Sequence, residues 1–290
     1  MHFPVLTKEV LEFLNPRLGE NFIDCTVDGG GHAREILKKI SPDGKLLGID
    51  LDSEMIKNTR LEINDENLIL VNENFKNLKK IIEEKKFSRV SGILIDLGWS
   101  STQIEKSGRG FSFLKDEPLD MRYSSSGMTA AEAANQLSEK DLADIFWQYG
   151  EERFSRRIAK KIVEARKKKR ILTTFDLVEA VKTAVPRSYE RGRIHPATRV
   201  FQGLRIYVNQ ELENLKEVLP QAVEILAPGG RLAVISFHSL EDRIVKNFFR
   251  EMKKEGRLEI LTKKPVVPSD EEIKLNPRSR SAKLRVCRKI

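Results

Sequence analysis

Short apolar runs alternate with amphipathic segments along the N-terminal third of the chain. The apolar runs cover residues 22–27, 46–49, 68–71 and 92–95. Runs that are apolar throughout are typical of strands buried on both faces of a sheet. The segments between them space their apolar residues as one face of a helix does. This alternation predicts a parallel sheet covered by helices on both sides.

A different pattern occupies residues 105–208, which have helical spacing and no parallel-strand signal. The predicted helices cover residues 128–137, 139–149, 151–169 and 174–184. Ser138 and Thr173 directly precede two of them, and both carry side chains that commonly cap a helix N-terminus. This part of the chain is therefore predicted to be a separate, all-helical domain.

The alternating pattern returns after residue 208. Helices are predicted at 212–226 and 240–254, strands at 231–237, 258–261 and 282–286, and a polar connection at 263–281. The chain is thus predicted to be an α/β protein with one open, mostly parallel sheet. Residues 1–104 and 209–290 would form the sheet domain, and residues 105–208 would be inserted after the fourth strand. Open sheets bind ligands at the carboxyl ends of their strands, where this insertion leaves the sheet.

Composition adds information on partners and compartment. The 290 residues carry a net charge of +9, which favours anionic partners, nucleic acid before a membrane surface. No apolar run approaches the ~20 residues of a membrane span, and the N-terminus has no secretion-signal pattern. Cys25 and Cys287 lie in separate strand-like segments, and the four histidines are scattered. We therefore expect a cytoplasmic protein with reduced thiols, no metal site and no membrane partner.

Three consecutive glycines follow the first predicted strand. Gly29, Gly30 and Gly31 can bring the backbone close to a ligand, and the helix that follows offers free N–H groups. Asp50 ends the second strand, where a carboxylate can accept two hydrogen bonds from a ribose diol. Together these features predict an adenosine-binding site. A glycine turn without a ligand, and a helix cap at Asp50, are the simpler alternatives.

The spacing of the glycine loop favours one class of cofactor. Arg34 stands where a dinucleotide fingerprint needs a small residue, and no further glycine follows in the helix. This disfavours a cradle for pyrophosphate, and with it a nicotinamide-dependent oxidoreductase. S-adenosylmethionine has no phosphates, and the loop would line its methionine part. His32 opens the helix and is either a cap or surface residue, or a contact to the amino-acid part of the cofactor.

The fourth strand ends in an acid that is followed by an aromatic residue, Asp96 and Trp99. Such a pair can hold a planar base, because the carboxylate accepts hydrogen bonds from an exocyclic amine and the ring stacks on the base. An acceptor that draws the N–H protons out of plane would also localise the amine lone pair. A sulfonium is an activated methyl donor, so positioning and electrostatics would supply most of the rate. Asp96 and Trp99 are the candidate catalytic residues; a strand-end cap and a core aromatic are the alternatives.

Several longer segments, spread over the chain, resemble one protein family. They are residues 1–14, 28–32, 96–101, 109–113, 119–122, 195–205, 236–243 and 278–285. Together they closely resemble the bacterial RsmH (MraW) family, the small-subunit ribosomal RNA cytosine-N4 methyltransferases. The resemblance covers essentially the whole chain. It implies a class I, Rossmann-like methyltransferase sheet that carries an inserted helical domain.

The resemblance also implies an activity and a set of site residues. The activity is methylation of the N4 amine of a cytidine in the decoding region of 16S rRNA, with S-adenosyl-L-methionine as methyl donor. The implied cofactor-binding residues are Gly30, Gly31, His32, Asp50, Phe75, Asp96 and Gln103. Phe75 follows the third strand, where a core aromatic fits equally well, and Gln103 has no signal of its own.

Basic residues gather in three stretches, at residues 153–170, 187–195 and 278–288. The first contains ten basic residues and one acid, Glu164. Separate basic stretches suit a large folded RNA, such as 16S rRNA within the 30S subunit, and phosphate contacts would make binding salt-dependent. The helical domain is therefore predicted to recognise RNA, with an ordinary solvated helix as the alternative for residues 153–170. A non-catalytic RNA-binding or ribosome-assembly factor on a methyltransferase fold is the alternative for the whole chain.

Overall fold

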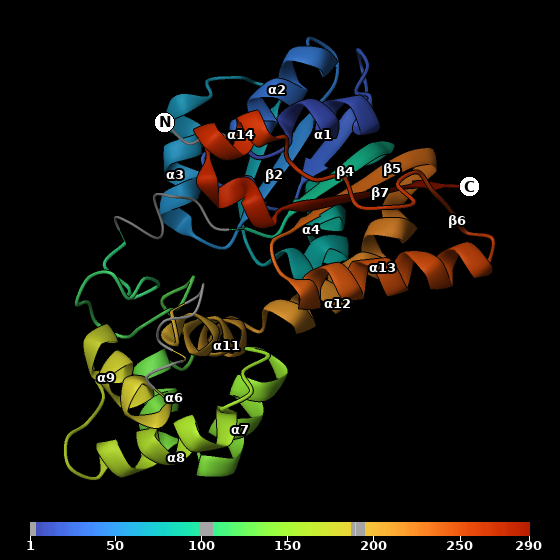
Figure 1. The fold of residues 1–290 in the computed structure, drawn as a ribbon. Helices are drawn as coiled ribbons and strands as arrows, with labels where there is room; N and C mark the ends of the chain where they lie inside the picture. Colours follow the sequence, from blue (N-terminus) through green and yellow to red (C-terminus); the bar gives the residue numbers. More distant parts are fainter. Residues whose placement is uncertain (1–3, 99–106, 187–188, 190–194) are drawn as a thin grey trace. The chain divides into compact units, whose positions relative to one another are not determined.

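A computed structural model describes residues 4–98, 107–186, 189 and 195–290 of the chain (Figure 1). The chain divides into two compact units. Residues 1–100 and 212–290 form the first, and residues 101–211 form the second. Within the described ranges, no helix is long and apolar enough to cross a membrane.

In the described part of the first unit, seven strands form one sheet in the order β3-β2-β1-β4-β5-β7-β6. The strands are β1 Asn21–Asp24, β2 Leu46–Asp50, β3 Leu68–Asn72, β4 Val90–Asp96, β5 Leu226–Ser236, β6 Leu258–Ile260 and β7 Lys283–Lys289. β1 to β5 run parallel, whereas β7 runs antiparallel between β5 and β6. The predicted α/β class, with a mostly parallel, Rossmann-like sheet, is confirmed.

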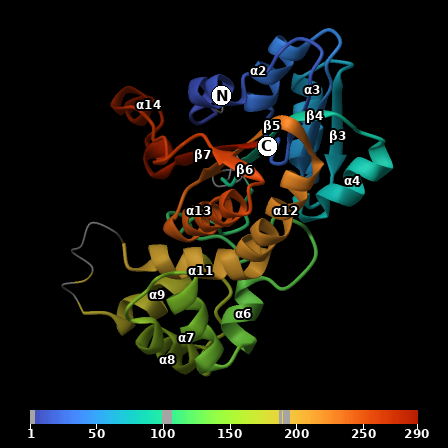
Figure 2. The same ribbon diagram turned by 90° about the vertical axis from the view of Figure 1, so that its right-hand side faces the viewer.

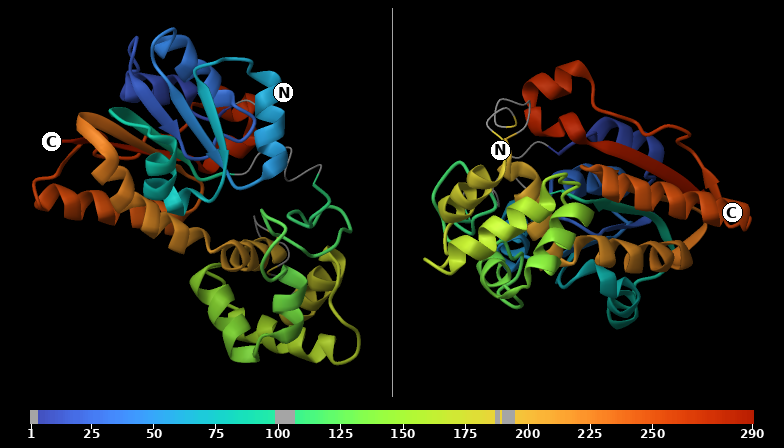
Figure 3. Two further views of the ribbon diagram at one scale, coloured as in Figure 1. Left: turned by 180° about the vertical axis from the view of Figure 1, so that it is seen from behind. Right: turned by 60° about the horizontal axis from the view of Figure 1, so that its bottom comes forward.

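Helices cover both faces of this sheet (Figures 1 and 2). They are α1 Thr7–Leu14, α2 Gly31–Ile40, α3 Ser53–Glu62, α4 Leu78–Lys85, α12 Glu211–Ile225 and α13 Ser239–Lys254. α1, α2 and α3 share one buried cluster with Phe22 and Leu94, and α4, α12 and α13 share a second with Ile23 and Ile93. Neighbouring strand residues thus go to opposite faces, as the period of a strand requires. Figure 3 shows the same layers from behind and from below.

The segment 263–281 connects β6 to β7, as predicted, but it also contains two short helices that the sequence analysis did not predict. It contains a short helix, α14 Asp270–Leu275, and a 3₁₀ helix, η2 Pro277–Ser281. The Glu272 carboxylate accepts a hydrogen bond from the backbone N–H of Leu6 at 2.8 Å, which ties α14 to the start of α1. A contact between residues this far apart in sequence leaves no local pattern.

The second unit is helical in its described part. Its helices are α6 Ala130–Gln136, α7 Glu139–Gln148, α8 Ser155–Arg166, α9 Thr174–Ala184 and α11 Ala197–Asn209. The predicted caps are confirmed, since Ser138 accepts the N–H of Asp141 and Thr173 accepts that of Asp176. α8 is shorter than predicted, and the sequence analysis did not predict α11.

Two of the motif segments pack together inside this helical unit. The Phe113 ring stacks on His195 with centroids 4.7 Å apart and meets Phe201 edge-on at 5.2 Å. The Arg109 guanidinium donates hydrogen bonds to the carbonyl oxygens of Arg122 and Tyr123. These contacts show that the motif segments help to build the helical unit.

Replacing Gly92 by Ala is expected to lower the free energy of unfolding by about 2–3 kcal/mol, because an overfilled core must shift. Gly92 lies in β4, where an added Cβ would overlap the buried ring of Phe22. Gly29→Ala is the matched control, since a Cβ there meets no atom within 4 Å. Urea unfolding of both variants measures the difference, and equal stabilities would contradict the packing at Gly92.

Candidate functional site

Three carboxylates meet at the carboxyl edge of the sheet. Asp24 ends β1, Asp50 ends β2 and Asp96 ends β4. β1 pairs in parallel with both neighbours, so the three strand ends lie side by side. This is the edge at which open α/β sheets bind ligands.

The glycine loop connects β1 to α2 at the same edge. Gly30 precedes the first residue of α2 with φ 75°, a left-handed conformation that favours glycine. A Cβ there would also lie 2.6 Å from Cδ1 of Ile63. A Cβ built on Gly29, in contrast, meets no atom within 4 Å. The loop is therefore closed toward α3 at Gly30 and open at Gly29, as the predicted approach of a ligand to the backbone requires.

Asp50 braces the glycine loop and does not cap α3. Its Oδ2 accepts the N–H of Asp28 at 2.9 Å, and its Oδ1 accepts the N–H of Asp52 at 2.8 Å. Asp52 is the cap of α3, with its Oδ1 accepting the N–H of Glu54. The helix-cap alternative for Asp50 is wrong. Each carboxylate oxygen still has a second lone pair with which to accept a ligand hydroxyl.

The pKa of Asp50 lies well above its ordinary value. Loss of solvation raises it to about 7, while the backbone N–H bonds from Asp52 and Asp28 act in the opposite direction. The charges of Asp28 and Asp52 also contribute to the increase in this pKa. Asp50 is thus poised to gain or lose a proton near neutral pH.

His32 lies inside the protein, so its reading as a surface residue is wrong. It is 6% exposed, and its Nε2 lies 3.5 Å from Oδ2 of Asp96. Burial alone would lower its pKa. The nearby Asp96 carboxylate, with the charges of Asp24 and Glu272, outweighs burial and raises it. His32 and Asp96 therefore lie side by side at the start of α2, and these surroundings favour the protonated form of the His32 ring.

Asp24 is a member of this cluster that the sequence analysis missed. It is 1% exposed, and burial raises its pKa to about 6 against the opposing charge of His32 and the N–H of Thr26. The signal available in the sequence was an acid at the end of the first strand, directly before the glycine loop.

Two buried polar atoms of the cluster lack a hydrogen bond among the residues that the structure describes. They are Oδ1 of Asp96 and Nε2 of His32, whose 3.5 Å approach to Asp96 is too long for a good hydrogen bond. Buried polar groups are nearly always paired. A carboxylate oxygen and a ring nitrogen without a hydrogen-bond partner in the described part of the chain therefore indicate where a polar ligand would be held.

The other predicted residues take different places. Gly31 is the first residue of α2, and a Cβ built on it would lie 3.0 Å from Pro4. Phe75 begins the 3₁₀ helix η1 Phe75–Asn77 directly after β3, where it is half-buried and packs against the core. Its core role is thus observed, and its cofactor role stays a prediction. Trp99 and Gln103 lie outside the described residues.

The segment after β5 is largely scaffold. The Glu241 carboxylate accepts the N–H groups of Phe237 and His238 and so caps α13. Asp242 forms a 2.6 Å ion pair with Arg285, which is 8% exposed. Arg285 belongs to the third basic stretch, so this part of that stretch serves the fold.

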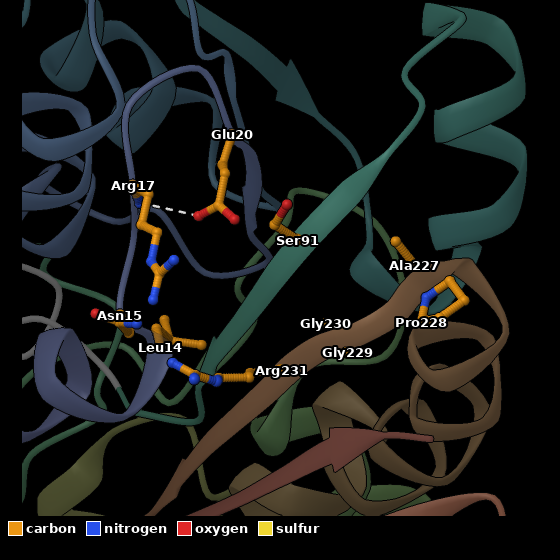
Figure 4. A pocket seen from close by; sticks show the side chains of 10 residues that line it. All are labelled: Leu14, Asn15, Arg17, Glu20, Ser91, Ala227, Pro228, Gly229, Gly230 and Arg231. Atoms are coloured by element: carbon orange, nitrogen blue, oxygen red, sulfur yellow. Dashed lines mark hydrogen bonds between the residues drawn. The ribbon is translucent and has the colours of Figure 1, made fainter.

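A pocket of about 230 Å³ lies at the opposite edge of the sheet (Figure 4). It is lined by residues before β1, at the start of β4 and around the start of β5: Leu14, Asn15, Arg17, Glu20, Ser91 and Ala227–Arg231. This is the amino edge of the parallel strands. Ligands of open sheets bind at the carboxyl edge, so this pocket is not the predicted cofactor site.

Replacing Asp24 by Asn is expected to stabilise the ligand-free protein at about pH 8. With a folded pKa of about 6 against an ordinary 3.8, ionisation of Asp24 destabilises the fold progressively as pH rises between these values. The full effect is on the order of 1–3 kcal/mol, and an Asn oxygen can still accept the Thr26 N–H. Unfolding measured at several pH values tests this, with the exposed Asp43→Asn as control. A destabilised Asp24→Asn protein at about pH 8 would refute it.

The comparisons with known proteins agree on one family. The model of the MraW methylase family matches residues 1–290. Ribosomal RNA small subunit methyltransferase H of Clostridium botulinum (strain Loch Maree / Type A3) is 47% identical over 306 residues, covering 100% of this chain and 99% of that protein. The protein of the same name from Syntrophotalea carbinolica is 48% identical over 307 residues, covering 100% and 98%.

A comparison with solved structures gives alignments over most of the chain. A methyltransferase-like protein of Streptococcus mutans, in complex with SAH, overlaps with a TM-score of 0.49 at 12% identity, covering 98% of this chain and 97% of that chain. That overlap is too low to support an inference about ligands. The family match is much stronger evidence. It spans all 290 residues, and nearly half of the positions are identical to those of the relatives over full length. The chain belongs to the MraW (RsmH) methylase family.

Proposed function

We propose that this protein transfers a methyl group from S-adenosylmethionine to the N4 amine of a cytidine in 16S rRNA, in the decoding region of the small subunit. The observation that carries the proposal is the grouping of the glycine loop, Asp50 and the His32–Asp96 pair at one carboxyl edge. Methylase family membership supplies the reaction class. The names of the relatives supply the substrate class, small-subunit ribosomal RNA.

The residues at this edge fit S-adenosylmethionine. The open space over Gly29 admits a ligand close to the backbone, and Asp50 would accept hydrogen bonds from the ribose hydroxyls. His32 and Asp96 have the charges that suit the carboxylate and the ammonium of the amino-acid part. Three carboxylates also suit a cofactor with a sulfonium. Phe75 and Gln103 would complete the set, as the resemblance implies.

The bound cofactor supplies an activated methyl group, so the chain has to position the acceptor. Asp96 has an unpartnered buried oxygen, Oδ1, among the described residues. That oxygen would accept a hydrogen bond from the exocyclic amine of the cytosine and draw the lone pair toward the methyl group. Trp99 would stack on the base after it leaves its helix. No covalent nucleophile is needed, and both cysteines are buried in the fold.

We propose that the helical unit, residues 105–208, contacts the RNA through α8. The outer side of this region presents exposed cations at Arg153, Arg156, Arg157 and Lys160. The Arg153 guanidinium lies over the rings of Phe154 and Tyr189, 4.8 and 4.7 Å from their centroids. A planar guanidinium and aromatic rings can stack on bases, and the exposed cations beside them can contact phosphates. This surface therefore suits folded RNA.

Other basic residues of the same stretch have structural roles. Arg166 donates to the carbonyl oxygens of Ala134 and Leu137, and Lys161 pairs with Glu164 at 2.6 Å. The RNA-contacting set is therefore smaller than the ten basic residues of the stretch. An assembled 30S subunit in the cytoplasm is the substrate we propose, because a broad basic surface suits a particle better than a short RNA.

Methyl transfer to undermethylated 30S subunits tests the proposal. With labelled S-adenosylmethionine, the wild-type protein should yield N4-methylcytidine, identified by mass spectrometry of the nucleosides. Asp96→Ala should lose transfer and keep RNA binding. Wild-type cofactor binding without transfer to any rRNA would instead favour the non-catalytic assembly factor. Binding of NAD(H) in place of S-adenosylmethionine would exclude a methyltransferase.

The affinity for S-adenosylmethionine is expected to fall as pH drops below about 7. Asp50 must be ionised to accept two ribose hydroxyls, and its pKa of about 7 in the free protein means that a proton has to leave first. Well below that pKa, affinity should fall up to about tenfold per pH unit. Calorimetric titrations from about pH 5.5 to 8.5 measure this. Asp50→Asn should bind weakly with little pH dependence, and an unchanged wild-type affinity across this range would contradict the role.

Neutralising two exposed cations of α8 is expected to weaken RNA binding and its salt dependence. Arg156→Gln with Lys160→Gln should lower the slope of log affinity against log salt by about one unit for each lost phosphate contact. Filter binding of 16S rRNA over a salt series measures the slope. Lys253→Gln, at the far end of α13, is the control. A slope equal to that of the control would remove this face from the RNA interface.

A further inference from the structure

Thr26 lies between two of the site carboxylates, directly after β1. Its backbone N–H donates to Oδ1 of Asp24 at 3.1 Å, and its hydroxyl lies 3.5 Å from the same oxygen. The same hydroxyl accepts the backbone N–H of Asp96 at 2.7 Å. One side chain thus joins the end of β1 to the last residue of β4.

This contact continues the sheet where its backbone pairing ends. The β1–β4 register stops at Asp24 opposite Leu94, followed by one more bond from the N–H of Cys25 to the carbonyl of Leu94. The next donor on β4 is the N–H of Asp96, and the Thr26 hydroxyl takes the place of a strand carbonyl as its acceptor. Without that hydroxyl the donor would lose its bond, which costs about 1–3 kcal/mol for a buried group.

The position of the Asp96 carboxylate follows from these contacts. Its backbone is held by Thr26, its Oδ2 faces His32 at 3.5 Å, and its Oδ1 has no hydrogen bond among the described residues. Asp24 acts on both groups that hold Asp96, because it accepts the Thr26 N–H and its charge faces His32. Oδ1 is therefore presented in one direction, and two of the groups that hold the carboxylate, Thr26 and Asp24, do not need to touch a ligand.

We propose that Thr26 is a positioning residue for Asp96, and that Asp24 orients Thr26. Together they set the rate of methyl transfer without contacting cofactor or RNA. The inference rests on the proposed function, in which Asp96 holds the acceptor amine. Displacement of a positioned group by about 1 Å can lower a rate on the order of 100-fold. A hydroxyl remote from the methyl group can thus matter for turnover.

Two substitutions at Thr26 separate positioning from folding. Thr26→Val keeps the shape and removes the hydroxyl, and Thr26→Ser keeps the hydroxyl. At saturating S-adenosylmethionine, kcat on 30S subunits should fall roughly 10- to 100-fold in the Val variant and stay within about twofold of wild type in the Ser variant. Thermal unfolding is measured in parallel. Equal kcat for Thr26→Val and wild type, or a loss in both variants that follows Tm alone, overturns the proposal.

Thr183→Val is the matched control for this substitution. The Thr183 hydroxyl donates to the carbonyl oxygen of Ala180 within α9, so the same change removes a hydroxyl bond outside the site. Its kcat should equal that of wild type. A loss of kcat similar to that of Thr26→Val would show that the effect is not specific to Thr26. That result would refute its role as a positioning residue for Asp96.

A second measurement needs neither RNA nor turnover, so it stands even where the proposed function fails. NMR titration of the His32 ring reports the cluster directly. The carboxylates that face His32 are Asp96 at the end of β4, Asp24 at the end of β1 and Glu272 on α14, and each raises its pKa. Asp24→Asn should therefore lower the pKa of His32. An unchanged value would remove Asp24 from the cluster and overturn its part of the proposal.

Discussion

The pairing of β1 with both β2 and β4 is the constraint on which the site depends. Each of these strands ends in an aspartate, and the parallel register brings Asp24, Asp50 and Asp96 to one edge. The turn that follows β1 then has to leave the sheet beside these carboxylates. Glycines allow that turn, and α2 starts where His32 can meet Asp96. The glycine loop and the Asp96 carboxylate are thus placed by the same three strands.

Such an edge is electrostatically unfavourable without a ligand. Burial raises the pKa of Asp24 to about 6 and that of Asp50 to about 7, so both resist ionisation in the free protein. His32 also faces Asp24, whose charge helps to raise the pKa of the ring. Apolar residues of the same size in place of these buried carboxylates would make the fold more stable. A cationic ligand would complement these carboxylates, as the proposed cofactor does with its sulfonium.

Much of this could be predicted from the sequence, because the signals are local. Strand-end acids, the glycine run and the apolar runs all lie within short windows, and Asp52 is a better cap than Asp50 by its position alone. Asp24, α11 and α14 were missed for a different reason. Asp24 acts on Asp96, about seventy residues away, through Thr26, and α14 is held by a contact between Glu272 and Leu6. Single-sequence patterns do not report such pairs.

The basic residues show the same limit, because their number does not reveal which of them serve the fold. A count of cations treats Arg156 and Arg285 alike, yet Arg156 is exposed on α8 and Arg285 is buried against Asp242. Arg166 is used to satisfy two carbonyl oxygens near the ends of α6. Net charge therefore predicts an anionic partner for the chain but not the surface that meets it. That surface is defined only after the cations with structural partners have been set aside, which leaves the exposed face of α8 as the stronger candidate.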